Sequence, residues 1–297
     1  MRKGKLNVDI VPSIKKLQVF TKGLIRTKGF GSYKSVFRGK GLEFLEYRSY
    51  DRNDDASMID WKASMRSNQL LIRQYAEERD INVLFLVDCS SSMIFGSTPK
   101  LKNEYAAELV ASLAFSILDA EDSVGLIMFN DKVVKNIYPS KGKVQFYNLV
   151  RILIDPNNYG GGYDFNAVTD FVLNYTKETA VVIIISDFVG LNQNFIKNME
   201  FITSKFDTIG IMVRDPRDKE LPEDVGQVVI EDPYSNNSLL IEPKLIKEVY
   251  EEEIKKQEKW IEDLFLKNKS DFLNLTTDKS FVKPILTMFK ERALKWR

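Results

Sequence analysis

The residues that could do chemistry lie in the stretch 83–93, V-L-F-L-V-D-C-S-S-S-M, where an aspartate and three serines follow an apolar run. Asp88, Ser90 and Ser92 have the spacing D-x-S-x-S, which lets a tight loop turn all three side chains inward. Carboxylate and hydroxyl oxygens are hard ligands suited to Mg²⁺ or Mn²⁺. Serine and aspartate also cap turns and helices well, so the spacing alone leaves a metal site and a structural cap equally open.

A second aspartate, Asp187, follows the apolar run T-A-V-V-I-I-I-S at residues 179–186. Both runs are apolar almost throughout, as expected of central strands that are covered on both faces of a sheet. In an open parallel sheet, ligand sites lie at the carboxyl ends of the strands, near the switch point at which helices change faces. We therefore expect Asp88 and Asp187 to converge at one edge of the sheet.

The composition excludes several kinds of catalytic site. The chain has no histidine, which excludes a Ser-His-Asp or Cys-His relay and a histidine-ligated zinc. A G-x-S-x-G elbow and a G-K-[ST] phosphate-binding loop are also absent from the sequence. Cys89 is the single cysteine, so an internal disulfide is excluded, and we expect its side chain to pack under the turn.

Short β-branched runs alternate with amphipathic segments after residue 80, which predicts βαβ units and an α/β fold. The predicted strands are residues 81–87, 123–129, 132–138, 179–186, 207–213 and 271–277. The predicted helices are residues 101–119, 142–154, 164–177, 191–204, 243–268 and 279–295. Asn130-Asp131 joins the second and third strands as a hairpin, which places one antiparallel strand at a sheet edge. The predicted fold is therefore a doubly wound, mainly parallel six-stranded sheet.

The chain divides into two regions. Residues 1–80 do not follow the βα rhythm and are predicted to form a basic, β-containing appendage, whereas residues 81–297 form the α/β domain. Residues 214–242 are rich in turn formers and indicate an insertion with one short strand near 227–231. Residues 1–48 contain twelve lysines or arginines and three acidic residues, which indicates either a solvated surface or a surface that binds an anionic partner.

The N-terminal region supports two further expectations. The charged stretch 43–66 interleaves acidic residues with Arg48, Arg52 and Arg66, and we favour ion pairs and turns there over a metal or acid–base site. The first residues lack the apolar region of a signal peptide, and no apolar run approaches the roughly 20 residues that span a bilayer. We therefore expect a soluble, cytoplasmic protein.

The segment F-L-V-D-C-S-S-S-M, together with I-I-I-S-D-F at residues 183–188, resembles the von Willebrand factor A fold with its metal-ion-dependent adhesion site. In that fold a D-x-S-x-S loop, a threonine loop and a later aspartate hold the ion. The resemblance implies that Asp88, Ser90, Ser92 and Asp187 are metal ligands.

More specifically, the chain resembles the bacterial proteins called domain of unknown function 58, which carry an A-type domain and are frequently associated with MoxR-type AAA+ ATPases. The matching features occur in order at residues 39–66, 72–93, 185–188, 215–233 and 276–278, before a closing helix that contains Arg292. Each motif is weak alone, whereas the ordered set spans most of the chain. The resemblance implies an adaptor or chaperone-like partner of a MoxR-type ATPase or of its client.

One loop departs from the A-type pattern. The loop expected to contain G-G-T-D is G-G-G-Y-D-F here, at residues 160–165. Tyr163 stands where a threonine ligand is expected, and its hydroxyl lies too far from the backbone to reach an ion in the same way. Three outcomes remain open: Asp164 or water completes the shell, Mg²⁺ or Mn²⁺ binds weakly, or the metal is lost and the surface is kept.

The leading hypothesis is a non-enzymatic protein-interaction module. In A-type domains a partner's carboxylate fills an open position on the ion, which would place Asp88, Ser90, Ser92, Tyr163 and Asp187 at the partner-binding surface. The enzyme alternative is a metal-dependent phosphate or ester hydrolase that uses Asp88 as nucleophile or ligand. A third alternative is nucleic-acid or anionic-membrane binding through the basic N-terminal region, which the scattered lysines do not favour.

Overall fold

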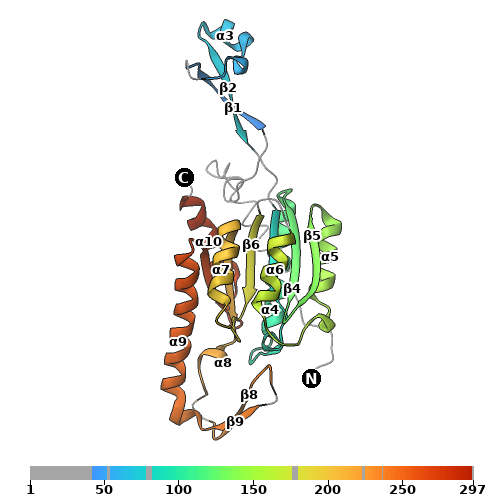
Figure 1. Cartoon of the computed structure of the whole chain (residues 1–297), viewed down its shortest axis with the longest axis vertical. Helices are drawn as coiled ribbons and strands as arrows, with labels where there is room; N and C mark the ends of the chain where they lie inside the picture. Colours follow the sequence, from blue (N-terminus) through green and yellow to red (C-terminus); the bar gives the residue numbers. More distant parts are fainter. Residues whose placement is uncertain are drawn as a thin grey trace.

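The centre of the protein is a six-stranded sheet with helices on both faces (Figure 1). The computed structural model describes residues 42–51, 54–77, 82–175, 180–222, 225–235 and 237–295. The strands, in spatial order, are β10 (Asp271–Thr276), β7 (Asp207–Arg214), β6 (Ala180–Ser186), β3 (Asn82–Asp88), β4 (Ser123–Phe129) and β5 (Val133–Ser140). Five of them are parallel, and β5 pairs antiparallel with β4 at the edge. The predicted fold class and the predicted hairpin are confirmed.

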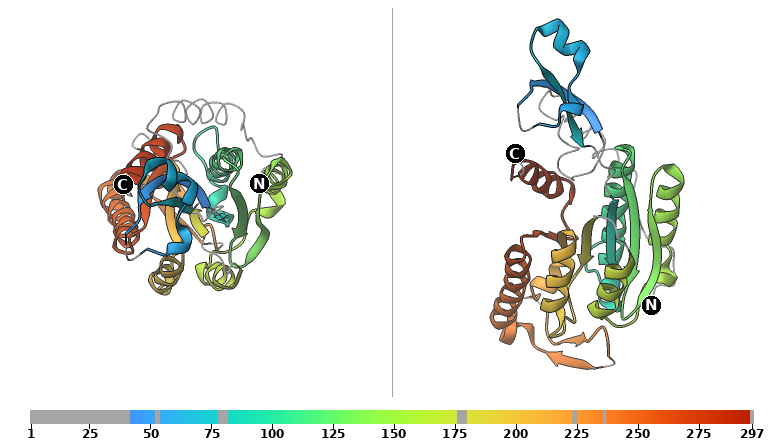
Figure 2. Two further views of the ribbon diagram at one scale, coloured as in Figure 1. Left: turned by 90° about the horizontal axis from the view of Figure 1, so that it is seen from above. Right: turned by 45° about the horizontal axis from the view of Figure 1, so that its top comes forward.

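Two apolar cores cover the two faces of the sheet. Alternate residues of β3 belong to different cores, because successive side chains of a strand point to opposite faces. One core packs the sheet against α4 (Lys102–Asp119), α5 (Lys143–Leu153) and α10 (Val282–Lys295). The other packs it against α6 (Phe165–Tyr175), α7 (Phe195–Lys205) and α9 (Pro243–Lys267). Figure 2 shows the resulting three layers.

The switch point of the sheet lies between β3 and β6. The chain leaves β3 through α4, on one face, and reaches β4 on one side of β3. β6 lies on the other side of β3, and the chain leaves it through α7 on the opposite face. The carboxyl ends of β3 and β6 are therefore neighbours at the position where doubly wound sheets place their ligand sites.

A small separate sheet precedes the domain. β1 (Leu42–Ser49) and β2 (Leu71–Glu77) pair antiparallel, and η1 (Ala56–Met58) and α3 (Trp61–Ser67) lie between them in the chain. In Figure 1 this unit stands beyond the amino end of the six-stranded sheet. Arg48 forms an ion pair with Asp54, and Asp60 accepts hydrogen bonds from the first turn of α3. For these residues the structural interpretation of the charged stretch is confirmed, whereas most of the basic segment lies outside the described residues.

The turn-rich segment 214–242 contains more structure than its sequence predicts. A short helix, α8 (Pro216–Lys219), is followed by a hairpin of β8 (Val228–Glu231) and β9 (Ser238–Ile241). The strand expected near 227–231 is present, whereas β9 was not expected. Only Glu242 separates the end of β9 at Ile241 from the start of α9 at Pro243, so the sequence pattern of this short strand merges with the beginning of the helix.

Two smaller observations complete the fold. α7 begins at Phe195 rather than at residue 191, because the side chain of Asn192 accepts a hydrogen bond from the backbone N–H of Asn194 and holds a turn there. None of the helices in the described parts of the chain combines the length and the apolar character needed to cross a membrane.

Candidate functional site

The carboxyl ends of β3 and β6 bring the two aspartates of the sequence analysis together. Asp88 is the last residue of β3, Asp187 directly follows β6, and both side chains are fully buried. The serine that ends β6 links the two strands, because Ser186 Oγ donates a hydrogen bond of 2.6 Å to Asp88 Oδ2. The convergence arises because parallel strands of equal register end at the same edge.

Both carboxylate oxygens of Asp88 accept hydrogen bonds. Oδ1 accepts the backbone N–H of Ser90 at 2.8 Å, and Oδ2 accepts the Ser186 hydroxyl, which itself accepts the N–H of Phe188. Burial, and then the charge of Asp187, raise the pKa of Asp88 to about 7. The carboxyl group therefore takes up a proton near neutral pH.

The hydroxyls of Ser90 and Ser92 contact a residue from the distant β8–β9 hairpin. Ser90 Oγ lies 3.1 Å from Ser92 Oγ, and the hydroxyl of Tyr234 lies 3.3 and 2.9 Å from these two atoms. The same hydroxyl donates to the carbonyl oxygen of Val189 at 2.9 Å. Asp232 fixes the turn by accepting the N–H of Tyr234 at 3.0 Å. Tyr234 thus closes over the two serines.

Asp187 is paired with a buried ammonium group. Lys102, the first residue of α4, donates to Asp187 Oδ2 at 2.7 Å and to Asp218 Oδ2 at 2.8 Å. The remaining oxygen of Asp187 accepts the N–H of Val189 at 3.0 Å. Burial lowers the pKa of Lys102, but Asp187 and Asp218 together outweigh burial and raise the pKa, so the side chain stays charged.

Tyr163 lies beside the cluster without joining its hydrogen bonds. Its ring contacts Phe129 with centroids 5.9 Å apart, and its buried hydroxyl has no hydrogen-bond partner among the described residues. Burial, and then the charges of Asp88 and Asp187, raise its pKa well above the ordinary value. Tyr163 is therefore a neutral phenol at physiological pH.

A glycine loop holds the segment before Tyr163 against the serine loop. Gly160 N–H donates to the carbonyl of Cys89 at 2.7 Å, and the N–H of Ser91 donates to the carbonyl of Gly161 at 3.0 Å. Gly161 has a φ of 91°, and a Cβ there would lie 2.6 Å from Nδ2 of Asn130. Glycine is required at this position because the backbone is left-handed and the approach is close.

Asp164, the substitute ligand considered from the sequence, lies in a different set of contacts. Its Oδ1 accepts from the N–H and the side-chain amide of Asn166, at 3.0 and 2.8 Å, and from Asn192 at 3.3 Å. These bonds hold the start of α6, and none of those described reaches Asp88 or Asp187.

Cys89 is packed under the turn. Its side chain is fully buried, and its thiol donates to the carbonyl of Phe129 at 3.1 Å. Burial, and then the charge of Asp88, raise the pKa of the thiol. The packing role expected from the sequence is what the structure shows.

The segments around Asp215 and Thr277 meet beside this cluster. Asp215 accepts from Ser97 Oγ at 2.5 Å, from the N–H of Ser97 at 2.8 Å and from Thr277 Oγ1 at 3.1 Å. The same aspartate caps α8, which carries Asp218. This network fixes the position of the Asp218 carboxylate that receives Lys102.

The observed arrangement does not fit a divalent cation at the positions implied by the resemblance. The carboxylate oxygens of Asp88 and Asp187 all accept hydrogen bonds, and Asp187 is already neutralised by Lys102. The hydroxyls of Ser90 and Ser92 are bonded to each other and to Tyr234. Groups of three or more His, Cys, Asp or Glu side chains able to hold a metal are absent from the described residues.

Sequence reasoning missed Lys102 and Tyr234. A signal for Lys102 existed, because it lies three and seven residues before Tyr105 and Leu109 and so shares the buried stripe of α4. A charged residue in an apolar stripe needs a buried partner of opposite charge. Tyr234 carried no comparable signal, since its contacts with the two serines are made 142 to 144 residues away in the chain.

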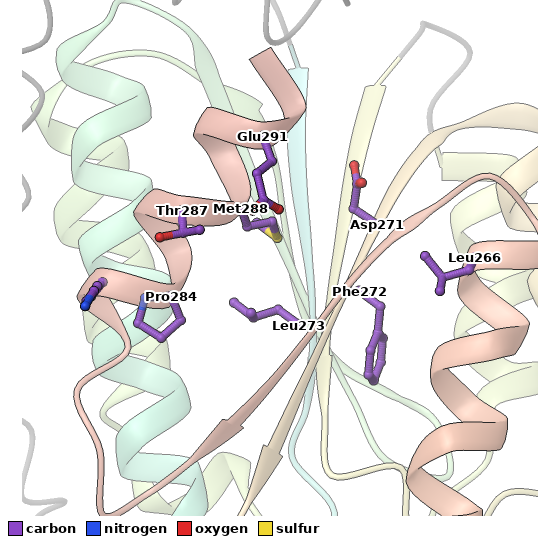
Figure 3. Close-up of a pocket in the computed structure, with 9 residues that line it drawn as sticks. Leu266, Asp271, Phe272, Leu273, Pro284, Thr287, Met288 and Glu291 are labelled. Carbon is purple, nitrogen blue, oxygen red and sulfur yellow. The ribbon is translucent and has the colours of Figure 1, made fainter. Parts of the chain in front are cut away.

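A cavity of about 430 Å³ lies elsewhere, between β10 and α10 (Figure 3). Leu273 of β10 and Met288 of α10 point toward each other across it, and Asp271 and Glu291 lie toward one end. Asp271 is paired with the buried Arg292. The cavity is distant from the carboxyl ends of β3 and β6, and we take the aspartate cluster as the candidate site.

Comparison with known proteins identifies the family. The family described as protein of unknown function DUF58 matches residues 46–260, well over half of the chain. The chain belongs to this family. An uncharacterized protein of Mycobacterium tuberculosis is 27% identical over 204 residues, which are 68% of this chain and 64% of that protein. The chain thus spans less than two thirds of the length of that relative. Uncharacterized protein YeaD of Bacillus subtilis is 30% identical over 107 residues, 36% of this chain and 24% of its own length.

Two solved structures match part of the chain at low sequence identity. The conserved hypothetical protein BatB from Bacteroides thetaiotaomicron is 16% identical, with a TM-score of 0.48 over 72% of this chain and 99% of that chain. A von Willebrand factor type A protein from Catenulispora acidiphila is 12% identical, with a TM-score of 0.34 over 48% of this chain and 35% of that chain. At this distance neither likeness assigns a ligand or a partner.

Proposed function

We propose that this DUF58 family member is a cytoplasmic, non-enzymatic protein-interaction module whose partner is a MoxR-type AAA+ ATPase. The partner class follows from the family resemblance of the ordered motifs. The chain has no phosphate-binding loop of its own, so the ATPase supplies the nucleotide chemistry. The docking surface is the β8–β9 hairpin at the carboxyl edge of the sheet.

The observation that carries the proposal is the exposed apolar surface of the hairpin. Val229 and Leu240 are directly opposed across the two strands, and each is 58% exposed. Leu239 and Ile230, on the other face, are also exposed. An isolated two-stranded hairpin has little stability of its own, and exposed apolar clusters mark interaction sites. Apolar exposure on both faces therefore supports docking of a protein partner here.

The burial of Asp88 supports an interaction module over the hydrolase alternative. A nucleophilic or metal-binding aspartate must reach substrate or water, whereas Asp88 is fully buried and both of its oxygens accept hydrogen bonds. Among the five residues expected to contact a partner, Ser90 and Ser92 contact Tyr234 of the hairpin, and Asp88 and Asp187 are fully buried. We infer that the partner touches the cover of the cluster rather than the cluster itself.

Affinity measurements with the MoxR-type ATPase of the same cell test this proposal. The double substitution Val229→Asp and Leu240→Asp should weaken binding tenfold or more, because apolar anchors at interfaces contribute about 2 kcal/mol or more each. Val144→Asp is the control, since Val144 is an apolar residue that is 73% exposed but lies in the first turn of α5, at the amino edge of the sheet. Equal binding by the double variant and the wild type would place the interface elsewhere.

A further inference from the structure

We propose that Lys102 is a built-in cation that takes the place of a divalent metal ion, so that the aspartate cluster works without metal. Its ammonium group lies between Asp187 and Asp218 at 2.7 and 2.8 Å. The Lys102 side chain is only 2% exposed. A single charge on a covalent tether thereby neutralises the carboxylate that the resemblance assigns to the ion.

Lys102 lies at a position of α4 where chiefly its ion pairs with Asp187 and Asp218 favour a buried cation. The backbone dipole of a helix disfavours a cation at the N-terminus, where Lys102 is the first helical residue. Burial of an ammonium group is also costly unless carboxylates compensate it. Helix position and burial both oppose this lysine, so the attraction of Asp187 and Asp218 must outweigh them. The face of the Phe95 ring, 5.6 Å from the ammonium nitrogen, adds a smaller favourable contribution.

The hydroxyl groups of Ser90 and Ser92 are likewise occupied by contacts within the protein. A cation held by Ser90 and Ser92 would need lone pairs of both hydroxyls directed at it. Those hydroxyls instead contact each other and Tyr234. The tyrosine hydroxyl has one hydrogen, and it goes to the carbonyl of Val189, because a carbonyl oxygen only accepts. The two serine hydrogens are then shared among the Ser90–Ser92 contact and the two contacts with Tyr234, so at least one serine donates to Tyr234 and helps to hold the hairpin in place.

Removal of the ammonium group should convert the cluster into a metal site. Lys102→Ala leaves two buried carboxylates without their cation and leaves space that a hydrated ion can enter. Lys102→Met removes the same charge but fills the space with a thioether of similar length, which is a poor ligand for Mn²⁺. Lys100→Ala removes a nearby lysine from a different ion pair, with Glu108, and serves as the control for loss of any lysine.

The test is the thermal unfolding of metal-free protein with added Mn²⁺, together with the loss of the free Mn²⁺ electron paramagnetic resonance signal. Wild type and Lys100→Ala should show no saturable change up to about 1 mM, the weak end of protein sites for hard divalent cations. Lys102→Ala should melt lower than wild type without metal. Its Tm should rise by about 3–6 °C when Mn²⁺ reaches ten times its Kd. Lys102→Met should melt lower and should not respond to Mn²⁺.

Two results would overturn the proposal. The first is saturable Mn²⁺ binding by wild type that Asp187→Asn abolishes, which would show that the ion and Lys102 coexist. The second is a folded Lys102→Ala protein that gains no Mn²⁺ response, which would reduce Lys102 to an ordinary ion pair. The wild-type titration decides by itself if the alanine variant does not fold. All measurements use the isolated protein, so the result is independent of the identity of any partner.

Discussion

The free energy of unfolding is predicted to fall as the pH rises from 5 to 8, because of Asp88. Burial and the neighbouring charge of Asp187 raise the pKa of Asp88 from 3.8 to about 7 in the folded protein. In the unfolded chain the carboxyl group has an ordinary pKa, so the folded state binds the extra proton between these two values. Stability from Asp88 is therefore fully present below about pH 4 and is lost as the pH rises through about 7.

The size of the effect follows from the width of this interval. Each pH unit over which the folded state holds one additional proton changes the free energy of unfolding by about 1.4 kcal/mol. Between pH 5 and the folded pKa of about 7, the loss is about 3 kcal/mol. Solvent does not weaken this effect by screening the charge, because the Asp88 side chain is completely buried. Carboxylates with lowered pKa, such as Asp215, affect stability only at more acidic pH and stay outside this window.

Urea unfolding monitored by circular dichroism at half-unit pH steps, in EDTA, measures the effect. The chain has no histidine, so the side chains that usually titrate between pH 5 and 8 are absent and the profile is free of them. Asp88→Asn should flatten the profile, because an amide does not titrate. Asp170→Asn, at an exposed position of α6, should retain it.

Three outcomes would refute the reasoning. A wild-type profile that stays flat across this window would mean that Asp88 ionises at an ordinary pKa despite its burial. A profile that persists unchanged in Asp88→Asn would assign the proton to another group. Stability that rises with pH would contradict the sign of the shift.

Three further predictions concern other parts of the molecule. Arg292→Met should lower the free energy of urea unfolding by about 1–3 kcal/mol, because the charge-assisted hydrogen bonds to Asp207 and Asp271, at the amino ends of β7 and β10, are lost; an unchanged unfolding midpoint would contradict this. Gly210→Ala should cost about 1–3 kcal/mol in the same assay, since its Cβ would lie 2.5 Å from the Phe265 ring, whereas equal stability would mean that the ring moves freely. Cys89 should react with a thiol-specific chromogenic reagent only upon unfolding, and fast labelling of the native protein would disprove its packing role.

The sheet could be predicted from the sequence because its signals are local. The apolar runs ending at Asp88 and Ser186 are long enough to mark central strands by themselves, and the Asn130-Asp131 turn marks the hairpin. Adjacent strand ends then place the two aspartates together without any knowledge of side-chain contacts. The strand boundaries agree with the predicted ones to within two residues for the same reason.

The contacts inside the site could not be predicted, because they are made between segments that are distant in the chain. Lys102 meets its two carboxylates 85 and 116 residues away, and Tyr234 reaches the serine loop from an insertion predicted to lie outside the sheet. Asp164 was considered as a ligand because it neighbours Tyr163, yet local hydrogen bonds with Asn166 commit it to the start of α6. Sequence proximity is a weak guide where short-range capping competes for a side chain.

Charge balance links the departures from the metal-site pattern. Two buried carboxylates, Asp88 and Asp187, require about two positive charges, which a divalent cation would supply at once. Lys102 supplies one charge, to Asp187, and shares it with the partly exposed Asp218. Asp88 has no cation beside it, so burial and then the charge of Asp187 raise its pKa to about 7, and a proton neutralises this carboxylate instead. An ammonium group, unlike a divalent cation, does not need a fixed set of oxygen ligands. The position of the threonine ligand can therefore hold the neutral phenol of Tyr163. The serine hydroxyls can contact Tyr234 and anchor the hairpin.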